Sequence, residues 1–537
     1  KSQTAAKIGL MTAISLIICS VVGVGIFFKN GSVFKNNNGN AIGVLVSWII
    51  TSVIALFTAI SFAEIVTVKK CAGTNAGLGG WTGAFCGYNF GRAVKIWMPT
   101  FYYSLKTVSM SIFAAAGIVY CAYALSDDPQ QPWFGNANNL TMLFITLIAV
   151  GLVFIFMTVN YISSRFGPKV SQISTILKFL PILIIVVFGI AFGIKNGGGL
   201  WTGDYSHITG VDQEQKGQFN ILGMLNSIPA IMFAFDGFLI VGNIATRVNE
   251  PEKNVGLSVV LSMIIVAVLN ILTTVACITI GTGNPYDVFD CSLEPFKNNV
   301  ANIFKSIFVM LTAILIALSA IGTVNSYSIV GPATCKDGIE SEMLMFGKQF
   351  KRFKNGNTHL AGTIYYSIIV GILFLAFGIP SSIMNTMQMY DGVSTICVLL
   401  FFAIYAVVCF GGFVNRFTKK NEVKESRMFK VAAPIAILGC FFVFGYSLVW
   451  TYTINIFNSG MENDFGVWGL SFTPNNLGKL KNWEAMIVFW TIIVVFIAYP
   501  FINDGVVQVT NKEYGHALMW QREKKIEVIV NAEKIKQ

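Results

Sequence analysis

The chain has 537 residues, of which 54% are hydrophobic and only 12% are charged. Soluble globular domains carry about a quarter charged residues, so this composition excludes an ordinary soluble protein and indicates an integral membrane protein. The formal charge of +11 does not indicate a nucleic-acid partner, because Lys and Arg cluster in alternate loops, as they do in an oriented membrane protein.

Twelve apolar runs follow one another, each long enough for the roughly 20-residue helix that crosses a bilayer. They lie near residues 8–34, 41–67, 97–125, 139–160, 170–195, 219–245, 255–283, 300–330, 360–380, 386–413, 429–457 and 485–503. This pattern predicts an all-α membrane protein with twelve transmembrane helices. The first run could also be read as a signal peptide, but no A-x-A-like cleavage site follows it, so we expect it to be retained.

The positive charges predict how the helices are oriented. With the N-terminus placed inside, the inner segments hold 27 Lys and Arg residues and the outer loops hold 8. Inner loops are enriched in Lys and Arg, so we expect a multi-pass plasma-membrane protein with both termini in the cytoplasm. We expect the charged loops to be exposed to solvent in the cytoplasm rather than to bind nucleic acid.

Two glycines interrupt the first run. In "VVGVGIFFKNG", Gly23 and Gly25 lie about midway along the expected helix. Glycine lets the backbone leave helical geometry cheaply, and a break exposes N–H groups and a positive dipole end that suit a carboxylate. Close helix packing through small residues explains the same glycines equally well.

The sixth run contains a second interruption. In "FAFDGF", Asp236 and Gly237 lie near the middle of an apolar stretch. An ionisable residue at this depth is costly and usually functional. Breaks in the first and sixth runs predict two inverted repeats with a site at their interface. We expect residues 1–195 to form the first repeat, 196–413 the second, and 414–537 two further helices and a tail.

Four motifs in order resemble one family of transporters. They are "VGVGIF", "SFAEIVTVKKCAGTNAG", "FAFDGF" with "NEPEKNVG", and "ALSAIGTVNS". Together they resemble the permeases of the amino acid–polyamine–organocation (APC) superfamily over residues 5–415. The resemblance implies the leucine-transporter-like fold, a five-plus-five inverted repeat in which helices 1 and 6 are broken. It also implies amino-acid transport by alternating access, coupled to protons or to exchange.

The resemblance further implies a substrate site built largely from backbone. Backbone N–H groups at the first break would hold the substrate carboxylate, and carbonyls at both breaks would hold its amine. Val24 stands where many members have a hydroxyl, so this site would rely on backbone contacts. Phe233 could form an aromatic lid or be an ordinary core residue. The expected substrate contacts are Val21, Gly23, Val24, Gly25, Ile26, Phe233, Phe235 and Asp236.

Three ionisable residues inside the runs each allow more than one functional or structural role. Lys178 matches a Lys of sodium-independent members, where it could load a proton or replace sodium permanently. Lys106 could meet an acidic substrate, pair with a carboxylate, or snorkel to the membrane surface. The Asp236 side chain could attract an amine or only stabilise the break. A second sodium site near Ser319 and Thr323 stays open.

Other function classes are weighed on the same residues. A polyamine exchanger of this fold, or a nutrient receptor without transport, fits the sequence. A metal carrier would need acidic and Asn residues in the first break, which "VVGVGIF" lacks. An enzyme is disfavoured because the three histidines lie outside the runs without metal spacing. We expect no cofactor and no bound metal; the expected partners are an amino acid, the lipid bilayer and protons.

Overall fold

The computed structural model describes residues 8–22, 25–72, 74, 76–124, 141–163, 165–208, 211–283, 285, 299–352, 357–384, 387–454 and 482–511. Within these ranges the chain is helical and contains no strand; one isolated β-bridge joins Ile8 and Val248. Helices satisfy their own backbone hydrogen bonds, which is what an apolar chain requires in lipid.

The first six predicted runs all fall on helix. The bounds are α1 Leu10–Val21, α2 Gly25–Asn36, α3 Ala41–Ile65, π-helical η2 Met98–Tyr102 leading into α6 Tyr103–Ala124, α7 Thr141–Ile162, α8 Phe166–Lys195, α9 Ile221–Phe233 and 3-10 helix η4 Ile240–Arg247. The first run is therefore divided into α1 and α2, and the sixth into α9 and η4. Both breaks were expected from the sequence.

The last six runs are also helical. The bounds are α10 Pro251–Ile280, α12 Asn299–Glu340, α14 Thr358–Met384, α15 Gln388–Thr418, α16 Phe429–Tyr446 continued by π-helical η7 Ser447–Ile454, and α18 Asn482–Thr510. Eight helices of the described part are individually long and apolar enough to cross a membrane. The halves of the broken spans, such as α1 and α9, are shorter apolar helices.

Two helices occupy the segment between the second and third spans, which the sequence analysis treated as a cytoplasmic connection. They are α4 Gly77–Cys86 and α5 Tyr88–Trp97. Gly87 joins them with φ +99°, a conformation that glycine adopts easily. A Cβ added at Gly91 would lie 2.4 Å from the Cα of Gly83, so small residues let the two helices pack closely.

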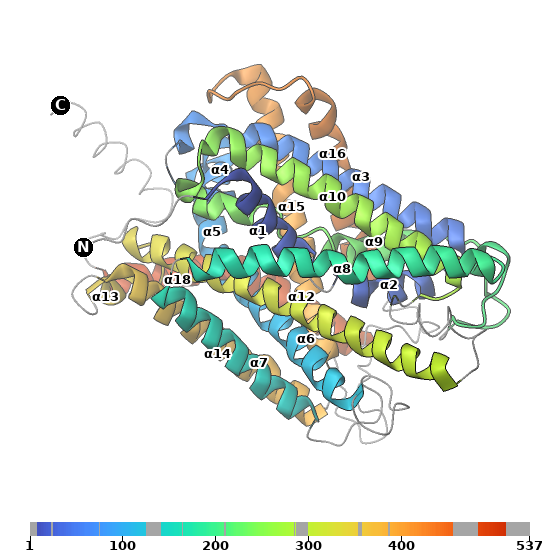
Figure 1. Cartoon of the computed structure of the whole chain (residues 1–537). Helices are drawn as coiled ribbons and strands as arrows, with labels where there is room; N and C mark the ends of the chain where they lie inside the picture. The colour runs from blue at the N-terminus through green and yellow to red at the C-terminus, as the bar shows by residue number, and fades with distance from the viewer. Residues whose placement is uncertain are drawn as a thin grey trace.

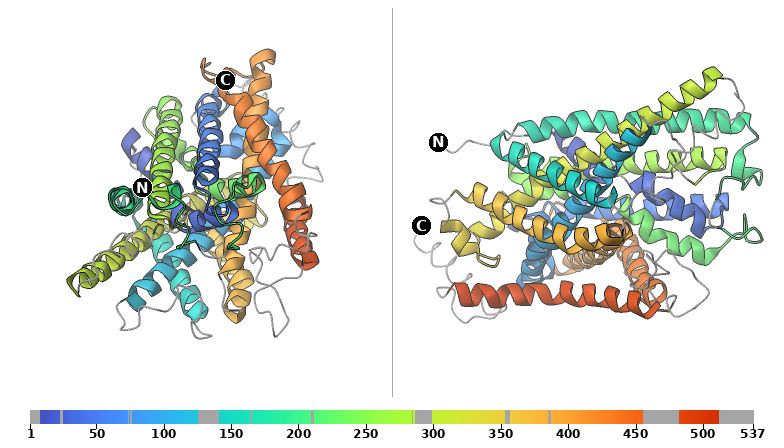
Figure 2. Two further views of the ribbon diagram at one scale, coloured as in Figure 1. Left: turned by 90° about the vertical axis from the view of Figure 1, so that its right-hand side faces the viewer. Right: turned by 90° about the horizontal axis from the view of Figure 1, so that it is seen from below.

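The core of the bundle is built around α12. This helix packs against α6, α8 and α14, while α3 lies beside both α10 and α16 (Figure 1). The helix α18 runs along an edge of the bundle (Figure 2). Large side chains buried from solvent, such as Trp48 and Tyr366, fill the space between these helices.

The two broken spans contact each other in opposite directions. Near the start of the first span, the Ile8 N–H donates to the carbonyl of Arg247, at the end of the sixth span, over 2.7 Å. At the other end, a Cβ added at Gly223 would lie 1.8 Å from the carbonyl oxygen of Asn36. The start of each span therefore meets the end of the other, and the breaks come together midway.

Candidate functional site

The breaks in the first and sixth spans touch directly. Gly25 is the first residue of α2, and a Cβ there would lie 2.7 Å from the Cα of Ala234. From the end of α1, the Ser20 hydroxyl donates to the carbonyl of Gly237 over 3.1 Å. Only glycine at position 25 allows this approach, which gives that residue a packing role as well as a conformational one.

The sixth span is unwound between α9 and η4, over residues 234–239. Short turn-type bonds replace the regular helical pattern, such as the Phe235 N–H donating to the carbonyl of Met232. Gly237 has φ +98°, which strongly favours glycine. A Cβ at Gly237 would also lie 2.9 Å from the hydroxyl oxygen of Tyr327. Backbone geometry and close packing both require glycine there.

A buried ion pair lies beside this unwound segment. The Asp236 Oδ2 atom is 3.0 Å from the Lys106 Nζ atom, and the two side chains are almost fully buried. Two hydroxyls donate to the other carboxylate oxygen, that of Tyr102 over 2.7 Å and that of Tyr405 over 3.3 Å. Lys106 is therefore paired, and it does not snorkel.

The ammonium groups of two lysines lie near the ring of Phe233. The Nζ atom of Lys106 is 3.9 Å from the ring centroid, and that of Lys29 is 5.0 Å from it. The Lys29 ammonium also donates to the hydroxyl of Thr395 over 3.0 Å. An ammonium this close to an aromatic face is attracted by the ring quadrupole. Phe233 is a buried member of the apolar core, and its ring also borders these two ammonium groups.

Lys178 closes the end of α1. Its ammonium donates to the carbonyls of Cys19 and Val22, each over 2.6 Å, and to the hydroxyl of Thr323 over 2.9 Å. Carbonyl and hydroxyl oxygens are ligands that a metal cation would also use. Here the Lys178 ammonium contacts all three oxygens, next to the end of α1.

Thr323 belongs to this Lys178 site. Its hydroxyl accepts from Lys178 and donates to the Cys19 carbonyl over 2.9 Å. A separate sodium site near Ser319 and Thr323 stays a prediction, and the Thr323 hydroxyl already contacts the Lys178 ammonium. Among the residues that the structure describes, no group of three or more His, Cys, Asp or Glu side chains could hold a metal ion.

The other expected contacts lie around the breaks in different ways. Val21 and Ile26 are buried on either side of the first break. The Phe235 ring is buried and packs on Trp48, with ring centroids 6.4 Å apart. Gly23 and Val24 lie outside the described residues.

Sequence reasoning missed the tyrosines around Asp236. Tyr102 precedes Lys106 by four residues, so both lie on one face of the third span. That spacing could have indicated the hydrogen bond and the ion pair to Asp236. Tyr405 and Tyr327 come from distant spans and had no comparable signal. Lys29 lies within the first predicted run and was not singled out, although it is in α2 and only 5% exposed.

Comparison with solved structures supports the same architecture. The crystal structure of MhsT in complex with L-phenylalanine aligns with a TM-score of 0.52 and 14% sequence identity, covering 81% of this chain and 97% of that one. At this identity the likeness concerns the fold alone. The two touching broken helices and this likeness place the chain in the leucine-transporter-like fold class.

Sequence comparisons identify the family. The serine/threonine exchanger SteT of Bacillus subtilis is 24% identical over 82% of this chain and 91% of its own length. The mouse b(0,+)-type amino acid transporter 1 is 23% identical over 77% of each chain. The family described as amino acid permease matches residues 8–503, so the chain belongs to that family and is a secondary amino-acid transporter. The resemblance found in the motifs is confirmed.

Proposed function

We propose that this permease moves an amino acid across the plasma membrane by alternating access, with both termini in the cytoplasm. Residues 1–195 and 196–413 would form the two inverted repeats, and coupling would be to protons or to counter-exchange. The observation that carries the proposal is the antiparallel contact of the two broken spans, where Gly25 meets Ala234. A site between two such breaks can open to either side when one helix group rocks against the other.

The substrate's α-carboxylate would bind at the start of α2. The N–H groups of Gly25 and Ile26 open this helix, and those of Gly23 and Val24 precede them. A helix start presents unpaired N–H groups and a positive dipole end to an anion. The substrate's ammonium would bind carbonyls near Val21 and along residues 233–236, where the backbone is unwound.

The ion pair at Asp236 favours an amino acid over a polyamine. A polyamine has no carboxylate for the start of α2 and would depend on a free carboxylate in the site. Asp236 already pairs with the Lys106 ammonium and accepts from Tyr102. A polycation would have to displace Lys106, leaving that ammonium buried without a counter-charge, which is strongly unfavourable.

Lys178 would link transport to its driving force. Its ammonium holds the end of α1 through the carbonyls of Cys19 and Val22. A buried Lys can release its proton during a conformational cycle, or it can remain a fixed cation. Transport by Lys178→Ala across a pH series separates these roles: unchanged pH dependence would remove Lys178 from proton coupling.

Ligand screening followed by uptake tests the function. Purified protein would be heated with each protein amino acid and with putrescine, spermidine and spermine, because a ligand of the folded state raises the melting temperature. The stabilising amino acid, radiolabelled, would then be offered to proteoliposomes preloaded with the same unlabelled compound. We expect accumulation inside the vesicles. Binding without accumulation would indicate a receptor, and stabilisation by polyamines alone would indicate the polyamine exchanger.

A further inference from the structure

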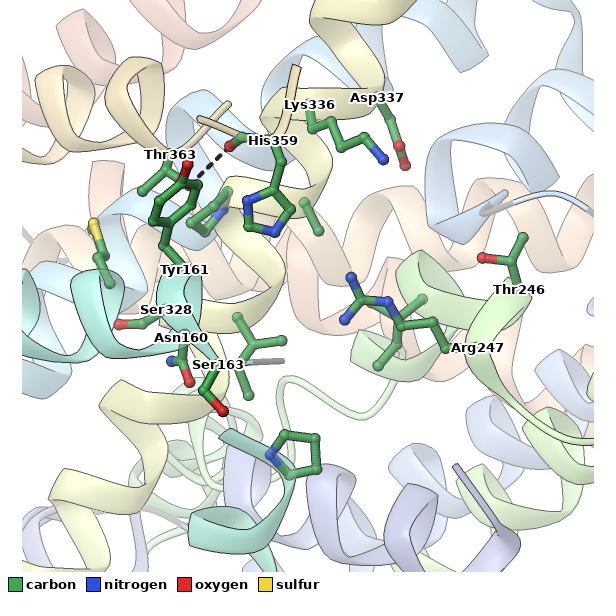
Figure 3. Close-up of a pocket in the computed structure, with 16 residues that line it drawn as sticks. Asn160, Tyr161, Ser163, Thr246, Arg247, Ser328, Lys336, Asp337, His359 and Thr363 are labelled. Atoms are coloured by element: carbon green, nitrogen blue, oxygen red, sulfur yellow. Dashed lines mark hydrogen bonds between the residues drawn. The ribbon is translucent and has the colours of Figure 1, made fainter. Parts of the chain in front are cut away.

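A cavity of about 370 Å³ opens at the end of the bundle where η4 ends (Figure 3). Its walls come from five elements, namely α7, the start of α8, η4, α12 and α14. This volume is within the range of roughly 300–1,000 Å³ typical of small-molecule pockets. Polar and charged residues of the lining include Asn160, Arg247, Ser328, Lys336, Asp337 and Thr363.

This cavity is separate from the substrate site between the breaks. None of its lining residues belongs to the Asp236 ion pair or to the Lys178 cluster. The link between the two places is η4, which begins just beyond the unwound segment and ends at Arg247 in the cavity wall. Under the orientation proposed above, the cavity faces the cytoplasm.

Two polar atoms in the wall lack partners. The Ser328 side chain is only 1% exposed, and its hydroxyl oxygen has no hydrogen bond. The Oδ1 atom of Asn160 is also buried without a partner, while its Nδ2 atom donates to Asn325. Buried polar groups are nearly always satisfied, and leaving one unpaired is costly. These atoms point to a polar ligand in the cavity.

The wall also carries charges of both signs. Figure 3 shows Arg247 facing Lys336 and Asp337 across the cavity, with the His359 ring to one side of them. Within the described part of the chain, the Arg247 guanidinium has no hydrogen bond or ion pair. The Asp337 carboxylate lies close enough to Arg247 to interact with it electrostatically. An arginine stays protonated under these conditions.

We propose that this cavity binds a zwitterionic α-amino acid as a second site on the cytoplasmic side. The ligand's carboxylate meets Arg247 with Lys336 nearby, and its ammonium meets Asp337. The unpartnered atoms of Ser328 and Asn160 complete the hydrogen bonds. A simple anion fits less well, because the Asp337 carboxylate would repel it. The inference rests on the proposed function for the class of ligand and for the side of the membrane.

A cysteine in the wall reports on occupancy. Thr363→Cys replaces a lining residue of similar size, and the full-length variant would be placed in nanodiscs of neutral lipid so that both faces are accessible. The rate of maleimide labelling would be measured with each of the twenty protein L-amino acids and with inorganic phosphate, all at equal ionic strength. The labelling rate of the parent chain would be subtracted as background. We expect at least one amino acid to slow labelling several-fold and phosphate to leave it unchanged.

Variants in the wall distinguish this site from the central one. Added to the reporter, R247Q or D337N is expected to abolish the protection, while R247K retains most of it. Because the central site is intact, the same amino acid should still raise the melting temperature of R247Q, which also shows that this variant is folded. Protection that persists in both R247Q and D337N would overturn the inference, since it would arise from the central site.

The remaining outcomes keep the two proposals apart. Protection by phosphate but by no amino acid would replace the inference with an anion site, and nanodiscs containing anionic lipid would then tell a lipid headgroup from the free ion. Thermal stabilisation by an amino acid without any protection would overturn the second site and leave the proposed function standing. Protection without stabilisation of R247Q or accumulation in vesicles would overturn the proposed function instead.

Discussion

At the scale of single residues, Asp236 is a carboxylate buried in the site that needs polar partners to offset its lost hydration. The residue is 2% exposed, and its carboxylate makes its polar contacts with Lys106, Tyr102 and Tyr405. Charges removed from water lose several kcal/mol of hydration each, which a partner must offset. The pair therefore restricts which charges can enter the site, and this restriction favours ligands that bring both signs.

Asp236→Asn should destabilise the protein strongly. It leaves the Lys106 ammonium buried without a counter-charge, and breaking a buried pair in this way costs about 3–5 kcal/mol. Thermal unfolding in detergent would measure the loss. The double variant Lys106→Met with Asp236→Leu removes both charges and should recover much of it. A single variant that melts like the parent protein would show that the pair is not buried as described.

Gly25→Ala should prevent the breaks from meeting. The new methyl group would lie 2.7 Å from the Cα of Ala234, a backbone atom that cannot move aside alone. We expect normal insertion into the membrane with little or no transport in proteoliposomes. Gly151→Ala is the matched control, because a Cβ there meets nothing within 4 Å, and it should transport normally. Full activity of Gly25→Ala would contradict the contact.

At the scale of elements, ion pairs join the end of α3 to the end of α15. Arg416 contacts Glu64 over 2.5 Å and also pairs with Glu425, and the Ser426 N–H donates to Glu64 over 2.6 Å. Lys69 pairs with Glu422 nearby, but both of these side chains are largely exposed. The buried contact should therefore matter far more than the exposed one.

Arg416→Gln tests this difference. It leaves the buried Glu64 carboxylate without its cation, so the melting temperature should fall clearly. Lys69→Gln removes an exposed cation at the same end of the bundle and should leave the melting temperature unchanged. The comparison uses thermal unfolding of both variants in one detergent. Equal effects of the two substitutions would argue against a buried clamp at this end.

The elements were predictable from the sequence to different degrees. Apolar length and glycine placed the twelve runs and both breaks, because these signals are local. The packing partners of Asp236 were not predictable, since Tyr405 reaches it from a span far along the chain. The helices α4 and α5 were missed because their glycines favour helix only through the close packing of the two helices, which the sequence does not show.

At the scale of the whole molecule, the antiparallel contact of the broken spans places the start of the first span and the end of the sixth at the same end of the helix bundle. The start of the described chain meets Arg247, and near its end Asn511 accepts from Lys348 over 3.0 Å. Lys336 lies near the end of α12 and Lys348 lies in the segment that follows it, so both fall between the eighth and ninth predicted runs. The excess of Lys and Arg in such segments is the basis for placing them in the cytoplasm.

Cysteine labelling in intact cells tests that orientation. Gln215→Cys lies exposed between α8 and α9, and Lys420→Cys lies exposed after α15. We expect a membrane-impermeant maleimide to label Gln215→Cys in intact cells and Lys420→Cys only after permeabilisation. The parent chain provides the background from native cysteines. The reverse pattern would invert the proposed topology.

The central claim is that an amino acid binds between the two breaks. A structure of the purified protein with the amino acid selected by thermal shift tests it most directly. We predict the ligand's carboxylate within about 2.7–3.2 Å of the Gly25 and Ile26 N–H groups, and its ammonium facing the unwound residues 233–236. A ligand bound elsewhere while Gly25 and Ala234 remain in contact and unoccupied would contradict the account.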